Sequence, residues 1–355
     1  MLTERLKKLT PYLPGEQPQD REYIKLNTNE NPYPPSPAVG EYLKTMDIGS
    51  LRRYPDPLFG ELRGALAERY GVEADQVFVG NGSDEVLSFI FYAFFDSRNG
   101  PLLFPEFTYS FYPVYCDFYS TAFQKVALKA DYSVDIDGFL EKGPSCGLIF
   151  PNPNAPTGIG LPLEQVARLM DRYPSDRVVV VDEAYIDFGG ESAVALMEKH
   201  ANLLVVRTFS KSLSLAGLRL GFAMGDQHLI KALYTVKDSF NSYPVDTLAQ
   251  KAGLLAVQDR AYYDRITARV IAAREAFSAD LDRLGWFFLP SAANFVFAGK
   301  KGVPGKEIYR NLKARGILVR YFDIAGLKDF VRITIGTGQE MKALVTAIEE
   351  SFQGL

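Results

Sequence analysis

The 355-residue chain has little of the chemistry on which disulfides, zinc sites and histidine-based catalysis depend, because it contains two cysteines and two histidines. Two cysteines cannot make a disulfide framework, and we expect Cys116 and Cys146 to be small core residues because their neighbours are apolar or aromatic. Neither His200 nor His228 has a partner at zinc-ligand spacing, so no metal site is expected. A Ser-His-Asp hydrolase is disfavoured as well, since the sequence has no Gly-x-Ser-x-Gly elbow, and it has no Walker loop.

The sequence also lacks an excess of positive charge and long apolar runs. Its 39 basic and 43 acidic residues give a net charge of -4, and no segment is strongly basic, so nucleic acid is not expected as a partner. The first six residues lack the apolar core of a signal peptide, and no apolar run reaches about 18 residues, the length of a membrane span. We therefore expect a cytoplasmic protein with no membrane partner, and its length suggests one large and one small lobe.

What the sequence does contain is a series of apolar runs that alternate with helical patterns. Residues 147–150, 177–181 and 202–206 read as strands, and 162–173 reads as a helix between the first two. Continuous valine and leucine runs of this kind are typical of a buried, mostly parallel sheet flanked by helices. Asn154, Asp182 and Lys211 are separated by about one strand–helix–strand unit each, so we expect them at the carboxyl edge of the sheet, where α/β folds bind ligands.

Both ends of the chain differ from this α/β pattern. Residues 1–32 are rich in proline with intervening aromatics, which is typical of an arm laid over another surface. We assign residues 33–245 to the large domain and 246–355 to a smaller α+β domain. The small domain is expected to begin with a long helical stretch over 246–284 and to contain strands at 294–297, 317–320 and 330–335.

The most informative segment is Thr208-Phe209-Ser210-Lys211, followed by Gly217-Leu218-Arg219-Leu220-Gly221. A lysine at the end of a strand can form a Schiff base with an aldehyde. A nearby serine and arginine can bind a phosphate. Pyridoxal 5′-phosphate carries both groups, so this segment predicts a cofactor as well as its anchor. The alternative is an ordinary surface lysine beside a buried strand.

Other residues could supply the remaining contacts that this cofactor needs. Asp182 follows four valines and could keep the ring nitrogen protonated, although it could also be the N-cap of the next helix. Gly82, Ser83 and Asp84 open a predicted helix whose N–H groups could bind phosphate, although capping explains the serine equally well. Tyr109 could stack on the ring, and Asn154 with Tyr185 could hold the ring hydroxyl, but each also has an ordinary structural explanation.

Taken together, these segments resemble the fold type I, aspartate-aminotransferase-like pyridoxal-phosphate enzymes over nearly the whole chain, and within them the histidinol-phosphate aminotransferases. The residues that carry the resemblance are 29–32 (NENP), 53–56 (RYPD), 80–85 (GNGSDE), 154–158 (NAPTG), 182–185 (DEAY), 208–211 (TFSK), 217–221 (GLRLG) and 331–336 (VRITIG). One departure is Pro153-Asn154-Ala155-Pro156, which replaces the commoner Asn-Asn-Pro versions and leaves the register of the asparagine uncertain.

The resemblance implies a role for each matched residue. Lys211 is implied as the catalytic Schiff-base lysine and proton shuttle. The implied cofactor contacts are Asp182 at the ring nitrogen, Tyr109 as stacking partner, Asn154 and Tyr185 at the ring hydroxyl, and Gly82, Ser83, Asp84, Ser210 and Arg219 at the phosphate. Tyr54 is implied to reach the phosphate of a neighbouring subunit, which predicts a homodimer with shared sites. Substrate contacts are implied for Tyr12, Asn29, Arg320 and Arg332, although Arg320 could instead form a surface ion pair.

The activity implied by the resemblance is a ping-pong transamination between histidinol phosphate plus 2-oxoglutarate and imidazole-acetol phosphate plus glutamate, in histidine biosynthesis. Three alternatives remain open at this point: an aminotransferase for aromatic amino acids, a lyase similar to threonine-phosphate decarboxylase, and a non-catalytic sensor domain. The sensor is the least favoured of these, because the sequence contains no basic patch and no helix-turn-helix precedes the domain.

Overall fold

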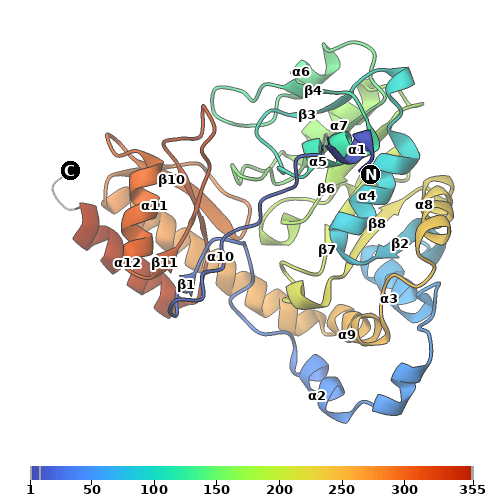
Figure 1. Cartoon of the computed structure of the whole chain (residues 1–355), viewed down its shortest axis with the longest axis horizontal. Helices are drawn as coiled ribbons and strands as arrows, with labels where there is room; N and C mark the ends of the chain where they lie inside the picture. Colours follow the sequence, from blue (N-terminus) through green and yellow to red (C-terminus); the bar gives the residue numbers. More distant parts are fainter. Residues whose placement is uncertain (1, 8, 353–355) are drawn as a thin grey trace.

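The larger body of the molecule is a seven-stranded sheet with helices on both faces (Figure 1). The strand order is β2-β8-β7-β6-β5-β3-β4, and β8 runs antiparallel to both of its neighbours while the other pairs are parallel. The strands are β2 (Val77–Gly80), β3 (Leu102–Pro105), β4 (Phe123–Val126), β5 (Gly147–Pro151), β6 (Val178–Asp182), β7 (Leu203–Thr208) and β8 (Gly221–Gly225). This confirms the expected α/β fold with a mostly parallel sheet.

The computed structural model describes residues 2–7 and 9–352. Residues 1 and 8 of the predicted arm, and residues 353–355 of the predicted small domain, therefore lie outside the described part. The helices are α1 (Glu4–Lys7), α2 (Pro37–Thr45), α3 (Gly60–Tyr70), α4 (Gly82–Phe94), α5 (Tyr112–Tyr119), α6 (Ile136–Leu140), α7 (Leu163–Arg172), α8 (Gln227–Phe240), α9 (Thr247–Gln258), α10 (Arg260–Arg283), α11 (Gly305–Ala314) and α12 (Gly338–Phe352). Within this described part, no helix combines the length and the apolar character needed to cross a bilayer.

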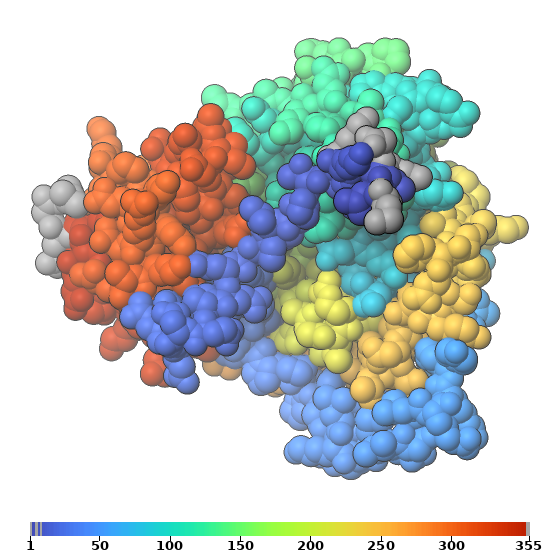
Figure 2. All heavy atoms as spheres, in the orientation of Figure 1, coloured from blue at the N-terminus to red at the C-terminus, as the bar shows by residue number. Residues whose placement is uncertain are grey.

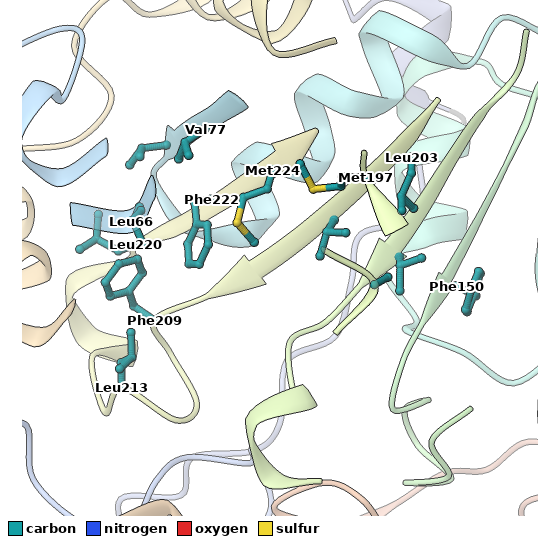
Figure 3. Close-up of a cluster of buried hydrophobic side chains, with 14 of the residues drawn as sticks. Leu66, Val77, Phe150, Met197, Leu203, Phe209, Leu213, Leu220, Phe222 and Met224 are labelled. Atoms are coloured by element: carbon teal, nitrogen blue, oxygen red, sulfur yellow. The ribbon is translucent and has the colours of Figure 1, made fainter. Parts of the chain in front are cut away.

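Strand β7 shows why the central strands are apolar at every position. Leu203 and Val205 belong to a core on one face of the sheet, which α3, α6, α7 and α9 cover, and Figure 3 shows part of it. Leu204 and Val206 point into a second core on the opposite face, beneath α4, α5 and α8. A strand buried on both faces has no solvent-facing side on which polar residues could alternate. Both cysteines are buried in the second core, as expected.

The smaller body is a four-stranded antiparallel sheet packed against α10, α11 and α12. Its order is β12 (Arg320–Tyr321), β13 (Val331–Thr334), β10 (Phe295–Lys300) and β9 (Trp286–Phe288). A separate core lies behind this sheet, and it includes Val296, Ile333 and Ile348. Figure 1 shows α10 running from this body towards α9 and the larger sheet.

One expectation about the C-terminal region was wrong in detail. The segment 317–320 is not one strand but two short ones, because β11 (Ile317–Leu318) pairs with β1 (Ile24–Lys25) and β12 pairs with β13. The stretch 246–284 is mostly helical, as expected, and consists of α9 and α10. The two helices meet at Asp259, whose side chain accepts a hydrogen bond from the backbone N–H of Tyr262 and so begins the second one.

The N-terminal segment lies over both bodies, as Figure 2 shows. It passes from α1, beside the large body, to β1. Strand β1 pairs in parallel with β11 of the smaller body, and the two form a separate two-stranded sheet. The segment is thus tied down by strand pairing at its far end as well as by surface contact.

Candidate active site

Two adjoining cavities lie at the carboxyl edge of the large sheet. The first has a volume of about 290 Å³ and is lined by residues from the ends of β6 and β7, the start of α4 and the N-terminal segment. The second has a volume of about 230 Å³ and shares Thr28, Tyr109, Tyr185 and Lys211 with the first. The strand-end position expected for Asp182 and Lys211 therefore brings them to one cavity. We call the first the inner cavity and the second the outer cavity.

Lys211 follows β7 and reaches the wall that both cavities share. Its Nζ donates a hydrogen bond to the carbonyl oxygen of Thr28 over 3.2 Å and lies 5.7 Å from the centre of the Tyr185 ring. The amide of Asn31 donates to the carbonyl oxygens of Lys211, at 3.0 Å, and of Ser212, at 3.3 Å. The Asn31 side chain, 180 residues away in sequence, thus restrains the backbone of Lys211.

Asp182 is the last residue of β6 and is 4% exposed. One carboxylate oxygen accepts from the hydroxyl of Tyr112 at 2.9 Å, and the other accepts from the backbone N–H of Ala184 at 3.2 Å. Burial raises the pKa of Asp182 to about 6, although both hydrogen bonds and Lys211 act to lower it. A cationic group placed beside this carboxylate would stabilise its charged form, so the residue is suited to bind a protonated ring nitrogen.

The start of α4 and the turn before β8 meet at one corner of the inner cavity, where phosphate binding was predicted. Arg219 donates to the hydroxyl of Ser210 at 3.4 Å, and its other terminal nitrogen lies 3.0 Å from the carboxylate of Asp84. Gly82 has φ +83°, and a Cβ there would lie 2.7 Å from the Arg219 guanidinium. A Cβ on Gly221 would lie 2.2 Å from the backbone nitrogen of Ser83. Both glycines are therefore required for the arginine and the helix N-terminus to meet.

Tyr109 and Tyr185 line the inner cavity as predicted, whereas Asn154 lines neither cavity. Tyr109 donates its hydroxyl to Asp84 at 2.9 Å, and its burial raises its pKa well above the usual value. The hydroxyl of Tyr185 accepts from the amide of Asn29 at 2.9 Å. Asn154 is fully buried, and its Oδ1 has no hydrogen-bond partner among the residues that the structure describes. A bound hydroxyl could donate to this oxygen.

The residues present fit pyridoxal 5′-phosphate. The cavity offers an amine for the aldehyde, a buried carboxylate for the ring nitrogen, an aromatic ring beside the cavity and a helix N-terminus with an arginine for the phosphate. The observation that points to a ligand here is the unsatisfied, buried oxygen of Asn154, which is next in sequence to Ala155 of the cavity wall. Where the described residues are concerned, no cluster of His, Cys, Asp or Glu is arranged to hold a metal ion.

The outer cavity is lined by the residues predicted to contact substrate: Tyr12, Asn29, Arg320 and Arg332. The two arginines are directly opposite each other across the β12–β13 pair. Arg332 donates to the carbonyl oxygen of Asn27 at 3.3 Å, and its buried Nε has no partner among the described residues. Burial lowers the pKa of Arg332, and Arg320 lowers it further, because like charges that face each other repel.

The other residues predicted to contact substrate make contacts between the N-terminal segment and the rest of the chain. Arg320 donates to the carbonyl oxygens of Leu13, at 3.2 Å, and Pro14, at 3.4 Å. Tyr12 packs against Phe111, with ring centroids 5.0 Å apart. The side chain of Asn29 is already engaged, since it donates to Tyr185 and accepts from a threonine of β13.

Three predicted site residues line neither cavity. Gly82 and Asn154 are next in sequence to lining residues, whereas Tyr54 lies away from them. Tyr54 is 81% exposed and stacks on Tyr243 with ring centroids 4.6 Å apart, and it lines neither cavity in this chain. Sequence reasoning also missed contributors, namely Tyr112, Thr28 and Asn31. Tyr112 gave no signal because it is one tyrosine among 20, and its contact with Asp182 joins residues 70 positions apart.

Comparisons with known proteins agree with this geometry. The family model described as aminotransferase class I and II matches residues 21–348. The histidinol-phosphate aminotransferase of Syntrophus aciditrophicus is 57% identical over 354 residues, which cover 99% of this chain and 98% of that protein. The enzyme of the same name from Chromohalobacter salexigens is 52% identical over 345 residues, which cover 97% of this chain and 97% of that protein.

A solved structure also matches over nearly the full length. The histidinol-phosphate aminotransferase of Sinorhizobium meliloti, in complex with pyridoxal-5′-phosphate, has a TM-score of 0.88, with 98% of this chain and 96% of that chain covered. Its sequence identity of 23% makes this a likeness of fold. The fold, the family match and the long, highly identical relatives lead to one conclusion: the chain belongs to the class I and II aminotransferases.

Proposed function

We propose that the protein is a pyridoxal-phosphate-dependent histidinol-phosphate aminotransferase of histidine biosynthesis. It would move an amino group between histidinol phosphate and 2-oxoglutarate, giving imidazole-acetol phosphate and glutamate. Relatives at 50–57% identity that carry this enzyme's name favour this function over an aromatic aminotransferase. A threonine-phosphate decarboxylase is among the structural neighbours, but at 23% identity it shares only the fold.

The observation that carries the proposal is the pair of arginines in the outer cavity. Histidinol phosphate has no carboxylate, so its phosphate must provide the charge by which it is anchored. Arg320 and Arg332 face each other across two strands, and the buried Nε of Arg332 has no hydrogen-bond partner within residues 2–7 and 9–352. A doubly charged phosphate would relieve their repulsion and satisfy that nitrogen. A glutamate or 2-oxoglutarate carboxylate could bind Arg332 in the other half-reaction.

The chain's own residues would divide the chemistry between them. When bound, the cofactor supplies a ring that withdraws electrons from the substrate's α-carbon. Asp182 would hold the ring nitrogen in its protonated form, and Lys211 Nζ would form the covalent link and then carry the proton to and from the α-carbon. Tyr109 would stack on the ring, and Asn154 and Tyr185 would bind its hydroxyl. Gly82, Ser83, Asp84, Ser210 and Arg219 would bind the phosphate, and Tyr12 and Asn29 would complete the substrate side.

The exposed position of Tyr54 supports a homodimer in which this residue completes the partner's cofactor site. Exposed apolar residues are close in sequence to Tyr54 or to its stacking partner Tyr243: Ile48, Leu51, Leu58 and Phe240. Exposed apolar patches mark interaction surfaces. We further propose an arm over residues 1–32, a large domain over 33–245 and a small domain over 246–355, with α9 packed against the large core.

Steady-state kinetics of an Arg320→Ala variant would test the substrate assignment. Loss of a charge-assisted contact, roughly 1.5–3 kcal/mol, predicts a KM for histidinol phosphate raised about 10- to 100-fold, with cofactor content unchanged. Arg21→Ala is a matched control, because Arg21 also donates to two main-chain carbonyls but lines neither cavity. An unchanged KM in the Arg320 variant would remove this residue from the site.

The alternatives can be separated with the unmodified protein. A histidinol-phosphate aminotransferase should have a much higher kcat/KM for histidinol phosphate than for phenylalanine. A decarboxylase would release carbon dioxide from phosphothreonine without 2-oxoglutarate. Absence of any 2-oxoglutarate-dependent amino transfer across a donor panel would overturn the proposal.

A further inference from the structure

A cluster of charged side chains lies next in sequence to Asp182 and Lys211, and the proposed reaction does not use it. Arg207 of β7 donates to the carboxylate of Asp187 at 2.6 Å, and its Nε lies 3.7 Å from a carboxylate oxygen of Glu183. The Arg207 side chain is 6% exposed, and that of Glu183 is fully buried. The second oxygen of Asp187 accepts a hydrogen bond from the hydroxyl of Ser212.

The connectivity of this cluster links it to both ends of the cofactor site. Glu183 directly follows Asp182, and Ser212 directly follows Lys211. Asp182 and Lys211 line the inner cavity, whereas Glu183 and Ser212 do not. The cluster therefore ties together, from outside the cavity, the two segments that present the acid and the amine.

The hydrogen bonds of the cluster are nearly complete, which a buried ion group requires. Glu183 accepts from the backbone N–H of Ala193 and from the hydroxyl of Ser192, both at 2.6 Å. Burial raises the pKa of Glu183 to about 6. Arg207 and Ser212 hold the pKa of Asp187, whose side chain is 34% exposed, below its usual value. Such clusters rarely add much stability compared with apolar packing, and their value lies in fixing one geometry.

We infer that Ser212 is a positioning residue. Its hydroxyl binds Asp187, which Arg207 holds in place, and so fixes the backbone from which Lys211 reaches the cofactor and substrate. This inference rests on the proposed role of Lys211. Asn31 restrains the same two residues through their carbonyl oxygens, so the Lys211 backbone is held by the N-terminal segment and by the cluster. Removal of the Ser212 hydroxyl leaves the first restraint in place and removes the second.

The test compares Ser212→Ala with Ser214→Ala. Ser214 lies two residues further on, and its buried hydroxyl has no hydrogen-bond partner among the described residues. Its replacement by alanine therefore removes the same atom as Ser212→Ala but no hydrogen bond. In the holoenzyme, Ser212→Ala should lower kcat about tenfold, since small misplacements of a reacting group are costly. KM for the amino donor and cofactor content should stay within twofold of the wild type. Ser214→Ala should leave kcat unchanged.

A second readout does not depend on turnover. In the cofactor-free protein, reductive methylation followed by peptide mass mapping reports how readily each lysine reacts. Lys211 should react several-fold faster in Ser212→Ala than in Ser214→Ala, while the exposed Lys231 should react equally in both.

The possible outcomes separate this inference from the proposed function. An unchanged kcat and unchanged Lys211 reactivity in Ser212→Ala would overturn the inference. So would a fall in kcat that is matched by an equal loss of cofactor or by the same fall in Ser214→Ala. A wild-type protein with no transaminase activity would instead overturn the proposed function, and the reactivity measurement would still decide the positioning role.

Discussion

Replacement of Asp182 by asparagine should stabilise the cofactor-free protein while impairing its function. Burial raises the pKa of this carboxyl from 3.8 to about 6, so the folded chain holds the charged form at a cost. Because one pKa unit corresponds to about 1.4 kcal/mol, the cost reaches about 3 kcal/mol at pH 7.5 and falls to about 1 kcal/mol at pH 4.5. The sign follows from the raised pKa: the folded state binds the proton more tightly, so stability is lost as pH rises from about 4 to 6.

An amide at this position avoids the charge and can keep both contacts. It can accept from the N–H of Ala184, and it can donate to the hydroxyl of Tyr112, which can reverse its role. Chemical unfolding of the cofactor-free proteins should therefore show Asp182→Asn to be more stable than wild type at pH 7.5, by up to about 3 kcal/mol, with a smaller gap at pH 4.5. Added cofactor should stabilise the variant less than the wild type. A variant less stable than wild type at pH 7.5 would refute the reasoning.

Two further predictions concern the phosphate corner and the partner subunit. Gly82→Ala should lower cofactor affinity at least tenfold, because a Cβ there strains a left-handed backbone and meets Arg219 at 2.7 Å. Gly64→Ala is the control and should leave the affinity unchanged, because its Cβ meets nothing within 4 Å. Equal cofactor dissociation constants for the two variants in a fluorescence titration would contradict this. If Tyr54 acts across a dimer, a hybrid of a Tyr54→Phe chain and a Lys211→Ala chain has one site with both native residues. Refolding a mixture of the two variants should therefore restore cofactor affinity in that site. A monomer in sedimentation would rule this out.

The parts of the site that follow strand ends could be predicted from the sequence. Runs of valine and leucine mark β6 and β7, and the carboxyl ends of parallel strands meet at one edge, so Asp182 and Lys211 had to be near each other. The resemblance assigned both Arg320 and Arg332 to substrate, and the two residues are direct cross-strand partners.

Contacts between distant segments could not be predicted in this way. The bond from Tyr112 to Asp182 and the contacts of Asn31 with the Lys211 backbone depend on how separate elements pack, and no local pattern encodes them. The helical pattern over 246–284 did not locate the junction of α9 and α10, because a capping aspartate resembles an ordinary polar position there. The strand at 317–320 divides because a partner strand arrives from the N-terminal segment, nearly 300 residues away.

The central claim is that Lys211 binds the aldehyde of the cofactor covalently. Borohydride reduction of the reconstituted protein, followed by peptide mass mapping, tests it directly. We expect a single pyridoxyl group on the peptide that contains Lys211, and none in Lys211→Ala. A reduced cofactor on another lysine, or no adduct in fully reconstituted wild-type protein, would contradict the account.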